Sequence, residues 1–323
     1  MSRSTRRRTP ARPGSRGAPT RRAADLPTGP LPTTTGTVEL VPDPDRNAVT
    51  VHVNGVPSSY VDLDDPGLLT FEYMQQMAAV IDGSAPPGPL RAVHLGAAGC
   101  SLPRWVEHSR PGSTQTAVDL DTELLERARE WFDLPRAPRL RLRPGDARAV
   151  LATLRDGSAD VVVRDVFAGD RTPDHLTTTG MAHEVWRVLT PDGLYLVNCA
   201  DRPPLALARA EVATLRAAGA RDVVMIAEPA VLRGRRYGNL VLAARPPRPP
   251  DDDGQRADDA PVPLADDAAL ARALRTLAVP ARALGGAELT AFAGTTPPRH
   301  DEPADPATPP PTEATAAADT AAP

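Results

Sequence analysis

Lysine is absent from this 323-residue chain, so all 37 of its basic side chains are arginines. A chain without lysine has neither the lysine of a phosphate-binding P-loop nor an amine for Schiff-base chemistry. Aromatic residues make up only 3% of the sequence, and the stacking surfaces that bind single-stranded nucleic acid are therefore not expected. The net charge of −4 gives no electrostatic reason to expect a nucleic-acid partner either.

Cysteines, metal-ligand spacings and long apolar runs are also scarce. Cys100 and Cys199 are the only cysteines and lack CxxC spacing, which indicates reduced thiols in a cytoplasmic protein. The six histidines include no pair at zinc-ligand spacing, so neither a metal nor another prosthetic group is expected. No run of about 18 apolar residues occurs, and the Arg-rich start lacks the apolar segment of a signal peptide. We therefore expect no membrane association.

Composition divides the chain into a folded part and two tails. Residues 1–36 carry eight arginines among the first 30 positions and are expected to be disordered. Most of residues 246–323, which are rich in proline, alanine and aspartate, are expected to be disordered as well. Inside this second tail, the leucine and alanine spacing of residues 268–292 predicts a helix. The folded part is then expected to span residues 37–245.

The first section of the folded part, residues 37–86, is predicted to hold a β-hairpin and a helix. Valines alternate with polar residues up to Asn54-Gly55, a dipeptide typical of tight hairpin turns, and residues 56–61 return as the partner strand. Residues 68–81 follow with apolar side chains at three- and four-residue spacing, which predicts a helix.

The second section, residues 87–245, alternates predicted strands and helices. This alternation predicts a mostly parallel sheet with helices on both faces, because parallel strands need crossover connections. The last two strands are joined by a short loop and are expected to form an antiparallel hairpin. We therefore predict an α/β fold with a seven-stranded Rossmann-like sheet, of the type found in S-adenosylmethionine-dependent methyltransferases. Its strands are expected near 91–95, 115–119, 139–143, 160–165, 193–199, 221–228 and 237–244, and its helices near 101–109, 122–132, 147–154, 177–189 and 204–218.

Polar residues or glycines follow several of these strands at the edge where open α/β sheets bind ligands. Gly96-Ala-Ala-Gly99 follows the first strand but lacks the G-x-G-x-x-G spacing of dinucleotide-binding folds. Asp165 ends the fourth strand, where it is well placed for chemistry. Arg164, which points to the opposite side of that strand, is expected at the surface or in an interface.

An acid after the second strand suggests a nucleoside ligand. Asp119 lies 23 residues after Gly96, about the spacing at which a carboxylate reaches the ribose hydroxyls of a bound adenosine. Helix capping is the alternative for Asp119 and is the role expected of Asp121. Asp146, after the third strand, is placed to accept from an adenine amine, again with capping as the alternative.

The chain resembles the spermidine synthase family of polyamine aminopropyltransferases in five segments that occur in the same order along the sequence. These segments are HLGAAGCSLPRW, AVDLD, GDA, DVVVRDVFAGD and TPDHLTT. The resemblance covers roughly residues 49–244, and Phe71-Glu72-Tyr73 stands where the family has its own aromatic pair. It implies transfer of an aminopropyl group from decarboxylated S-adenosylmethionine to a small polyamine, within a homodimer. No nucleic acid or membrane partner is implied.

The resemblance also implies a role for each matching residue. A primary amine is protonated at neutral pH, so a carboxylate must orient it and take its proton before it attacks the carbon beside sulfur. That carboxylate would be Asp165, assisted by Tyr73. The donor would be bound at its sulfonium end by Gly96 and Gly99, at its ribose by Asp119, and at its adenine by Asp146 and Ala147.

Three positions depart from the pattern of the family, because Cys100, Ala168 and Gln75 stand where acids are usual. Asp170 or Asp174 is expected to replace the acid missing at Ala168, and Gln75 stays a candidate for substrate binding. The missing acids leave two other functions open. One is methyl transfer from S-adenosylmethionine on the same fold, and the other is nucleoside binding without catalysis.

Overall fold

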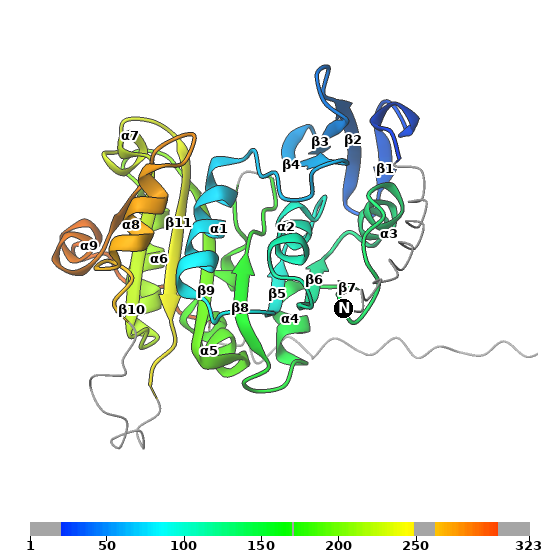
Figure 1. The fold of residues 1–323 in the computed structure, drawn as a ribbon. Helices are drawn as coiled ribbons and strands as arrows, with labels where there is room; N and C mark the ends of the chain where they lie inside the picture. The colour runs from blue at the N-terminus through cyan, green and yellow to red at the C-terminus, as the bar shows by residue number, and fades with distance from the viewer. Residues whose placement is uncertain (1–20, 170, 249–261, 303–323) are drawn as a thin grey trace, which may run out of the picture.

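An eight-stranded sheet forms the centre of the molecule, with the strand order β12-β10-β11-β9-β8-β5-β6-β7 (Figure 1). The computed structural model describes residues 21–169, 171–248 and 262–302. Five neighbouring strands are parallel, and β11, β10 and β12 continue the sheet in antiparallel pairs. The parallel strands are β5 (Arg91–Leu95), β6 (Thr114–Asp119), β7 (Leu140–Pro144), β8 (Ala159–Arg164) and β9 (Leu189–Asp201), and the others are β10 (Asp222–Ala227), β11 (Gly238–Arg245) and β12 (Arg282–Leu284).

The predicted Rossmann-like fold is confirmed, with one strand more than expected. The predicted terminal hairpin is present as β10 and β11, but β11 pairs with β9 and β12 takes the outer edge. All six residues of the central strand β8 are buried, as expected for a parallel strand that has helices on both faces.

Two layers of helices cover the sheet, and each has its own apolar core. One face is covered by α4, α5, α6 and α9, and the other by α1, α2 and α8, while α3 packs against the amino-terminal sheet. Among the described helices, none combines the length and apolarity needed to cross a membrane. The bounds are α1 (Glu72–Ser84), α2 (Ser101–Ser109), α3 (Thr122–Trp131), α4 (Ala147–Ala152), α5 (Thr179–Val188), α6 (Ala206–Ala217), α7 (Pro229–Leu232), α8 (Ala268–Arg275) and α9 (Gly286–Ala293).

The amino-terminal part forms a second, four-stranded antiparallel sheet, in which the predicted hairpin is the pair β3 (Ala48–Val53) and β4 (Val56–Asp62). Two further strands, β1 (Leu31–Thr33) and β2 (Gly36–Pro42), extend it. Predicted disorder is therefore wrong for residues 21–36, because Ala23 and Leu26 bury apolar surface in the core shared with α3. Residues 1–20 lie outside the described part.

The second predicted tail also contains folded structure. Residues 262–302 form α8, β12 and α9, so the single helix predicted for residues 268–292 is wrong. The helix α8 ends at Arg275, and Pro280, which has no amide hydrogen to donate, does not allow a helix to continue through the predicted range. The chain then adds a strand to the sheet edge. Leu264, Leu270 and Leu274 anchor the segment in the core beneath α1. Residues 249–261 and 303–323 lie outside the described part.

Candidate functional site

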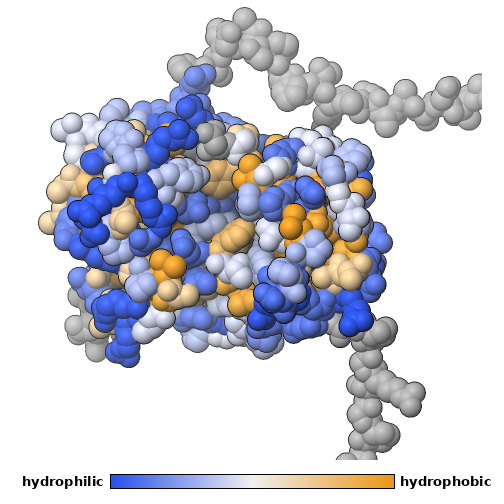
Figure 2. Space-filling model, turned by 90° about the horizontal axis from the view of Figure 1, so that it is seen from above, coloured by the Kyte–Doolittle hydropathy of each residue, from blue (hydrophilic) through white to orange (hydrophobic). Residues whose placement is uncertain are grey.

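A crevice of about 900 Å³ opens beyond the carboxyl ends of the parallel strands. Figure 2 views the molecule from this side and shows apolar side chains scattered among polar ones around the hollowed surface. Among the described residues, the lining contains no arginine, so the crevice favours a cationic ligand. Its carboxylates are Glu72, Asp119, Asp121, Asp146 and Asp165.

The turn after β5 brings Gly96 to the floor of the crevice. Gly96 has φ of +88°, and a Cβ atom there would lie 2.0 Å from the carbonyl oxygen of Asp165. Only glycine fits this backbone and this close approach. The turn therefore lies directly against the residue that ends β8.

Gly99, predicted to line the same end of the crevice, lies outside its lining. Its amide donates to Ser59 Oγ on β4 at 3.0 Å, and a Cβ atom there would lie 2.8 Å from Ser59 Cβ. Cys100 also turns away, into the core beneath the amino-terminal sheet, where burial raises the pKa of its thiol to about 12. The second half of the glycine turn thus holds the two sheets together.

Asp119 lies at the end of β6 and lines the crevice. Its Oδ2 accepts from the amides of Ala97 and Ala98, at 2.9 and 3.1 Å, and its Oδ1 accepts from the amide of Asp121 at 3.0 Å. A carboxylate offers about four acceptor sites, so about one remains free on Asp119. The side chain thus fixes the shape of the glycine turn and still faces the crevice.

Two further carboxylates start helices. Asp121 is the N-cap of α3, as predicted, with Oδ1 accepting from the amide of Leu124 at 2.9 Å. Asp146 is the N-cap of α4, and its other oxygen lies 2.8 Å from His175 Nε2. Helix capping therefore occupies one oxygen of Asp146, and a histidine contacts the other. Ala147, the next residue, lines the crevice beside it.

Asp165 follows β8 and receives two hydrogen bonds that fix its position. Tyr73 Oη, from the first turn of α1, donates to Oδ2 at 2.9 Å. Asn198 Nδ2, from β9, donates to Oδ1 at 2.8 Å. Burial raises the pKa of Asp165, although both hydrogen bonds act in the opposite direction. The carboxylate is thus rigid, faces the crevice and is a stronger base than an exposed aspartate.

Asn198 was not predicted from the sequence. Its Nδ2 is used by Asp165, while its buried Oδ1 has no hydrogen-bond partner within the described residues. The only indication in the sequence is that Asn198, an amide side chain, lies near the carboxyl end of a predicted apolar strand. Its meaning depends on β9 lying beside β8 in the sheet, which a single sequence does not state.

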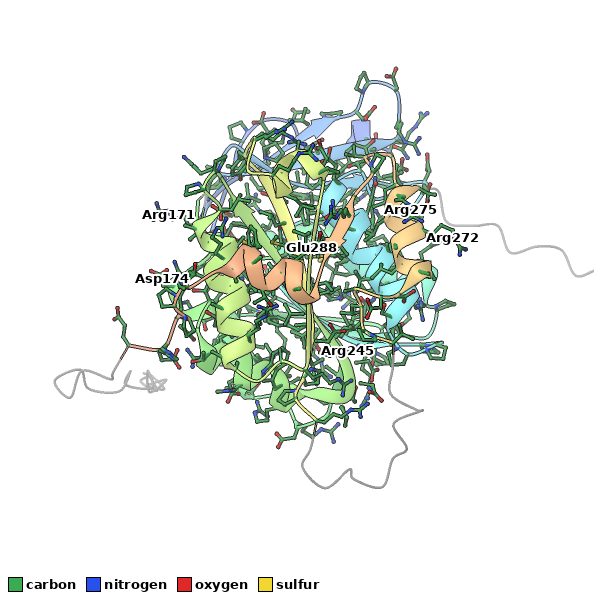
Figure 3. The ribbon with its side chains drawn as sticks, turned by 90° about the vertical axis from the view of Figure 1, so that its left-hand side faces the viewer. Arg171, Asp174, Arg245, Arg272, Arg275 and Glu288 are labelled. Atoms are coloured by element: carbon green, nitrogen blue, oxygen red, sulfur yellow. The ribbon has the colours of Figure 1, made fainter. Side chains whose placement is uncertain are left out.

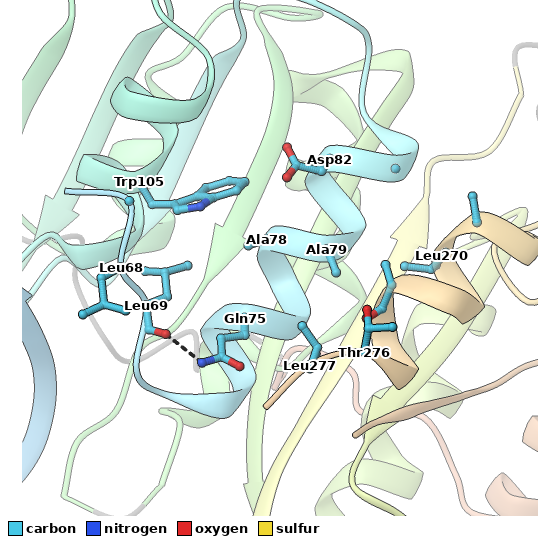
Figure 4. A pocket seen from close by; sticks show the side chains of 14 residues that line it. Leu68, Leu69, Gln75, Ala78, Ala79, Asp82, Trp105, Leu270, Thr276 and Leu277 are labelled. Carbon is cyan, nitrogen blue, oxygen red and sulfur yellow. Dashed lines mark hydrogen bonds between the residues drawn. The ribbon is translucent and has the colours of Figure 1, made fainter. Parts of the chain in front are cut away.

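Two of the three predicted substrate-binding residues, Gln75 and Asp174, lie outside the lining of the crevice. Gln75 lines a separate groove of about 580 Å³ between α1 and α8, where its Nε2 donates to the carbonyl of Leu69 at 2.7 Å (Figure 4). Asp174 points away from the crevice and forms an ion pair with Arg299 at 2.9 Å. Asp170 lies outside the described residues, and Ala168 lines the mouth of the crevice.

Arg164 is buried inside the chain, so its expected position at the surface or in an interface is wrong. It forms an ion pair with Glu211 of α6, which is also buried, and donates to the carbonyl of Leu176. The residue before the candidate catalytic acid therefore fastens the following loop to the helix layer.

Comparison with known proteins gives three findings. A sequence profile described as a methyltransferase domain matches residues 93–197. The solved structure of a probable spermidine synthase from Corynebacterium glutamicum is 36% identical, covers 88% of this chain and all of its own, and has a TM-score of 0.76. The polyamine aminopropyltransferase of Chromobacterium violaceum is 29% identical over 141 residues, which are 43% of this chain and 53% of that protein.

A methyltransferase is also similar to part of the chain. The eEF1A lysine and N-terminal methyltransferase of Homo sapiens is 30% identical over 125 residues, 35% of this chain and 18% of that protein. This chain spans about half the length of the curated polyamine aminopropyltransferases that it matches.

Proposed function

The chain belongs to the spermidine synthase family and is a transferase, and we propose that it moves an aminopropyl group from decarboxylated S-adenosylmethionine to an amine of a polyamine. One observation carries this proposal: Asp165 faces an acidic crevice while Tyr73 and Asn198 hold both of its oxygens. Both reactants are cations, and the described lining of the crevice has no arginine to repel them.

The donor would lie along the ends of β5, β6 and β7. Asp119 would use its remaining acceptor site for a ribose hydroxyl, and Leu120, which is 55% exposed beside it, offers an apolar surface to the base. The adenine would reach Asp146 and Ala147 at the end of β7. The turn at Gly96 lies directly against the backbone of Asp165, so a sulfonium bound at this turn would lie next to that acid.

The transfer of the aminopropyl group would need only one proton acceptor. The protonated acceptor amine donates a hydrogen bond to Asp165 and gives it one proton, and the free nitrogen then attacks the carbon next to sulfur. A carbon–nitrogen bond forms, the carbon–sulfur bond breaks, and the sulfur leaves as the neutral thioether of methylthioadenosine. The new secondary ammonium group carries the positive charge that the sulfonium loses, and Tyr73 Oη keeps the carboxylate of Asp165 aligned.

The amino group of the donor needs an acid other than those first predicted. Ala168 offers none, and Asp174 is paired with Arg299 outside the crevice. Glu72, which lines the crevice beside Tyr73, is a carboxylate suitable for this contact. Asp170 stays a candidate from the sequence alone.

Methyl transfer from S-adenosylmethionine is the second candidate function. It is supported by the methyltransferase profile and by the partial similarity to the eEF1A lysine and N-terminal methyltransferase. The apolar Ala168 also fits a donor that retains its own carboxylate. Binding without catalysis is the least supported function, because the contacts of Tyr73 and Asn198 prepare Asp165 as a base.

Calorimetric titration with both donors tests the proposed binding site. We expect wild-type protein to prefer decarboxylated S-adenosylmethionine, and Asp119→Asn to weaken binding of both donors. Asp133→Asn is the matched control, because Asp133 is exposed and lies outside the crevice lining. Preference for S-adenosylmethionine would favour methyl transfer, and no binding of either donor would contradict both enzymatic functions.

A further inference from the structure

Three consecutive residues near the end of the described chain contact the loop that follows β8. We call Arg299, His300 and Asp301 the C-terminal strap. After α9 the chain crosses α6 and reaches the side of the molecule where Asp174 lies (Figure 3). The strap thus joins the folded tail to the rim of the candidate active site.

Asp301 contacts the two helices that border this loop. Its carboxylate forms a bidentate ion pair with Arg148 of α4, with N–O distances of 2.6 and 2.8 Å. Oδ1 also accepts from Thr178 Oγ1, the N-cap of α5, at 2.6 Å. The hydrogen bonds from Arg148 lower the pKa of Asp301 to about 2, so this carboxylate is ionised at neutral pH.

The other two strap residues hold the loop from Asp174 to Thr179. Arg299 Nη1 donates to Asp174 Oδ1 at 2.9 Å and to Thr177 Oγ1 at 3.0 Å, and its carbonyl accepts from the amide of Thr179. His300 Nδ1 lies 3.1 Å from Thr179 Oγ1. The amide of Arg299 donates to Thr214 Oγ1 on α6, which anchors the strap to the helix layer.

A short chain of contacts runs from the strap to the crevice. Arg148, held by Asp301, also donates to the carbonyl of His175 at 3.2 Å. His175 lines the crevice and contacts Asp146 through Nε2 at 2.8 Å. Asp146 is the carboxylate placed at the adenine end of the proposed donor site. Only two contacts therefore separate Asp301 from a residue that lines the crevice.

We propose that Asp301 is a positioning residue for the donor nucleoside, acting through Arg148 and His175 on Asp146. The inference rests on the proposed function, because it needs an adenosyl ligand in the crevice. The tail beyond the Rossmann-like core is then part of the donor site. Removing the Asp301 carboxylate frees Arg148 and loosens the His175 loop, so donor affinity falls while the chemistry at Asp165 is unaffected.

Gly180 provides an independent way to displace the strap. A Cβ atom at Gly180 would lie 1.8 Å from Asp301 Oδ2 and 2.7 Å from Arg148 Nη2. Gly180 lies in the first turn of α5 without a positive φ, so alanine fits the backbone of the helix, and its nearest conflicts are with these two side-chain ends. Gly180→Ala should therefore reproduce the loss of Asp301, and it should add little in a chain that already carries Asp301→Ala.

The experiment measures affinity for methylthioadenosine, the nucleoside part shared by the proposed donor and product. We expect Asp301→Ala and Gly180→Ala each to raise the Kd by about three- to tenfold, as for residues coupled to a site without touching the ligand. The value of kcat at saturating donor should stay unchanged. Glu288→Gln, which breaks an exposed ion pair with Arg282 in the same tail segment, should change neither quantity.

Hydrogen exchange separates failure of this inference from failure of the proposed function. Amides of residues 174–179 should lose protection in Asp301→Ala but keep it in Glu288→Gln. Lost protection with an unchanged Kd would overturn the donor role of the strap, as would an equal rise in Kd in all three variants. If wild-type protein does not bind methylthioadenosine, the proposed function fails and the donor role fails with it, whatever the exchange data show.

Discussion

At the scale of single residues, the carboxylate proposed as the catalytic base, Asp165, also affects the stability of the fold. Burial raises its pKa, because the ionised form loses hydration. The folded chain therefore binds this proton more tightly than the unfolded chain. The contribution of Asp165 to stability is full below its unfolded pKa and is lost as the pH rises through its folded pKa. An ionised carboxylate at this position, which the proposed chemistry needs, therefore lowers the stability of the folded chain.

Asp165→Asn should separate these two properties. We expect kcat to fall by about 10²- to 10⁴-fold, the usual contribution of a general base. The melting temperature at pH 7.5 should stay the same or rise, because a neutral amide is easier to bury and can still bond to Tyr73 and Asn198. Activity assays and thermal melts of the same sample test this. A large drop in melting temperature would show that the carboxylate is mainly structural.

Asn198→Ala should change the pH dependence of the reaction. The hydrogen bond from Asn198 lowers the pKa of Asp165, so removing the amide raises that pKa further. The acidic limb of the profile of kcat/KM against pH should then move to higher pH, and Tyr73→Phe should move it in the same direction. An acidic limb that stays in place in both variants would exclude Asp165 as the titrating base.

Site residues could be predicted from the sequence only where their position next to a predicted strand end indicates a role. Asp119 and Asp165 end strands, so periodicity and the rule for parallel sheets located them at the crevice. Gly99 and Gln75 have suitable neighbours in sequence, but neither lines the crevice. Gly99 packs against β4 and Gln75 lines the groove beside α8, and the sequence does not show these contacts. Asn198 acquires its role from the lateral order of the strands, which the pattern of one chain does not contain.

At the scale of elements, the section from residue 87 to 245 was predictable because apolar periodicity there is strong. Its predicted strands and helices agree with the observed ones within a few residues. Most of the tail is predicted to be disordered because proline, alanine and aspartate dominate its average composition. Its few leucines are nonetheless spaced to bury one face of α8 against α1. That spacing predicts a helix within residues 268–292, but it indicates neither the end of α8 at Arg275 nor the strand β12 that follows.

Leu274→Ala tests whether the tail contributes to the stability of the whole domain. Leu274 is fully buried on α8, and truncation of such a side chain costs about 2–5 kcal/mol. Urea unfolding should show this loss in a single transition, since the core under α1 is shared with the sheet. Arg275→Gln, on the exposed side of the same helix, is the control and should change stability little. An unchanged unfolding midpoint for Leu274→Ala would show that the tail folds independently.

At the scale of the whole molecule, the second sheet and the tail enclose the ends of the Rossmann-like core. The amino-terminal sheet packs on α3, and its Ser59 accepts a hydrogen bond from the glycine turn. On the opposite side of the crevice, Asp301 of the strap accepts a hydrogen bond from Thr178. A homodimer and a cytoplasmic location stay predictions from the sequence. Sedimentation velocity should give twice the chain mass of 34.1 kDa if the dimer forms, and a species of one chain mass at micromolar concentration would contradict it.

The most direct test of the proposed function is a turnover competition between the two donors. Wild-type protein is incubated with equal amounts of decarboxylated S-adenosylmethionine and S-adenosylmethionine and with a short aliphatic diamine, and both thioether products are quantified by mass spectrometry. We expect methylthioadenosine together with an aminopropylated amine, both formed at least about 100-fold more slowly in Asp165→Asn. S-adenosylhomocysteine as the main product would contradict aminopropyl transfer and assign methyl transfer to this crevice.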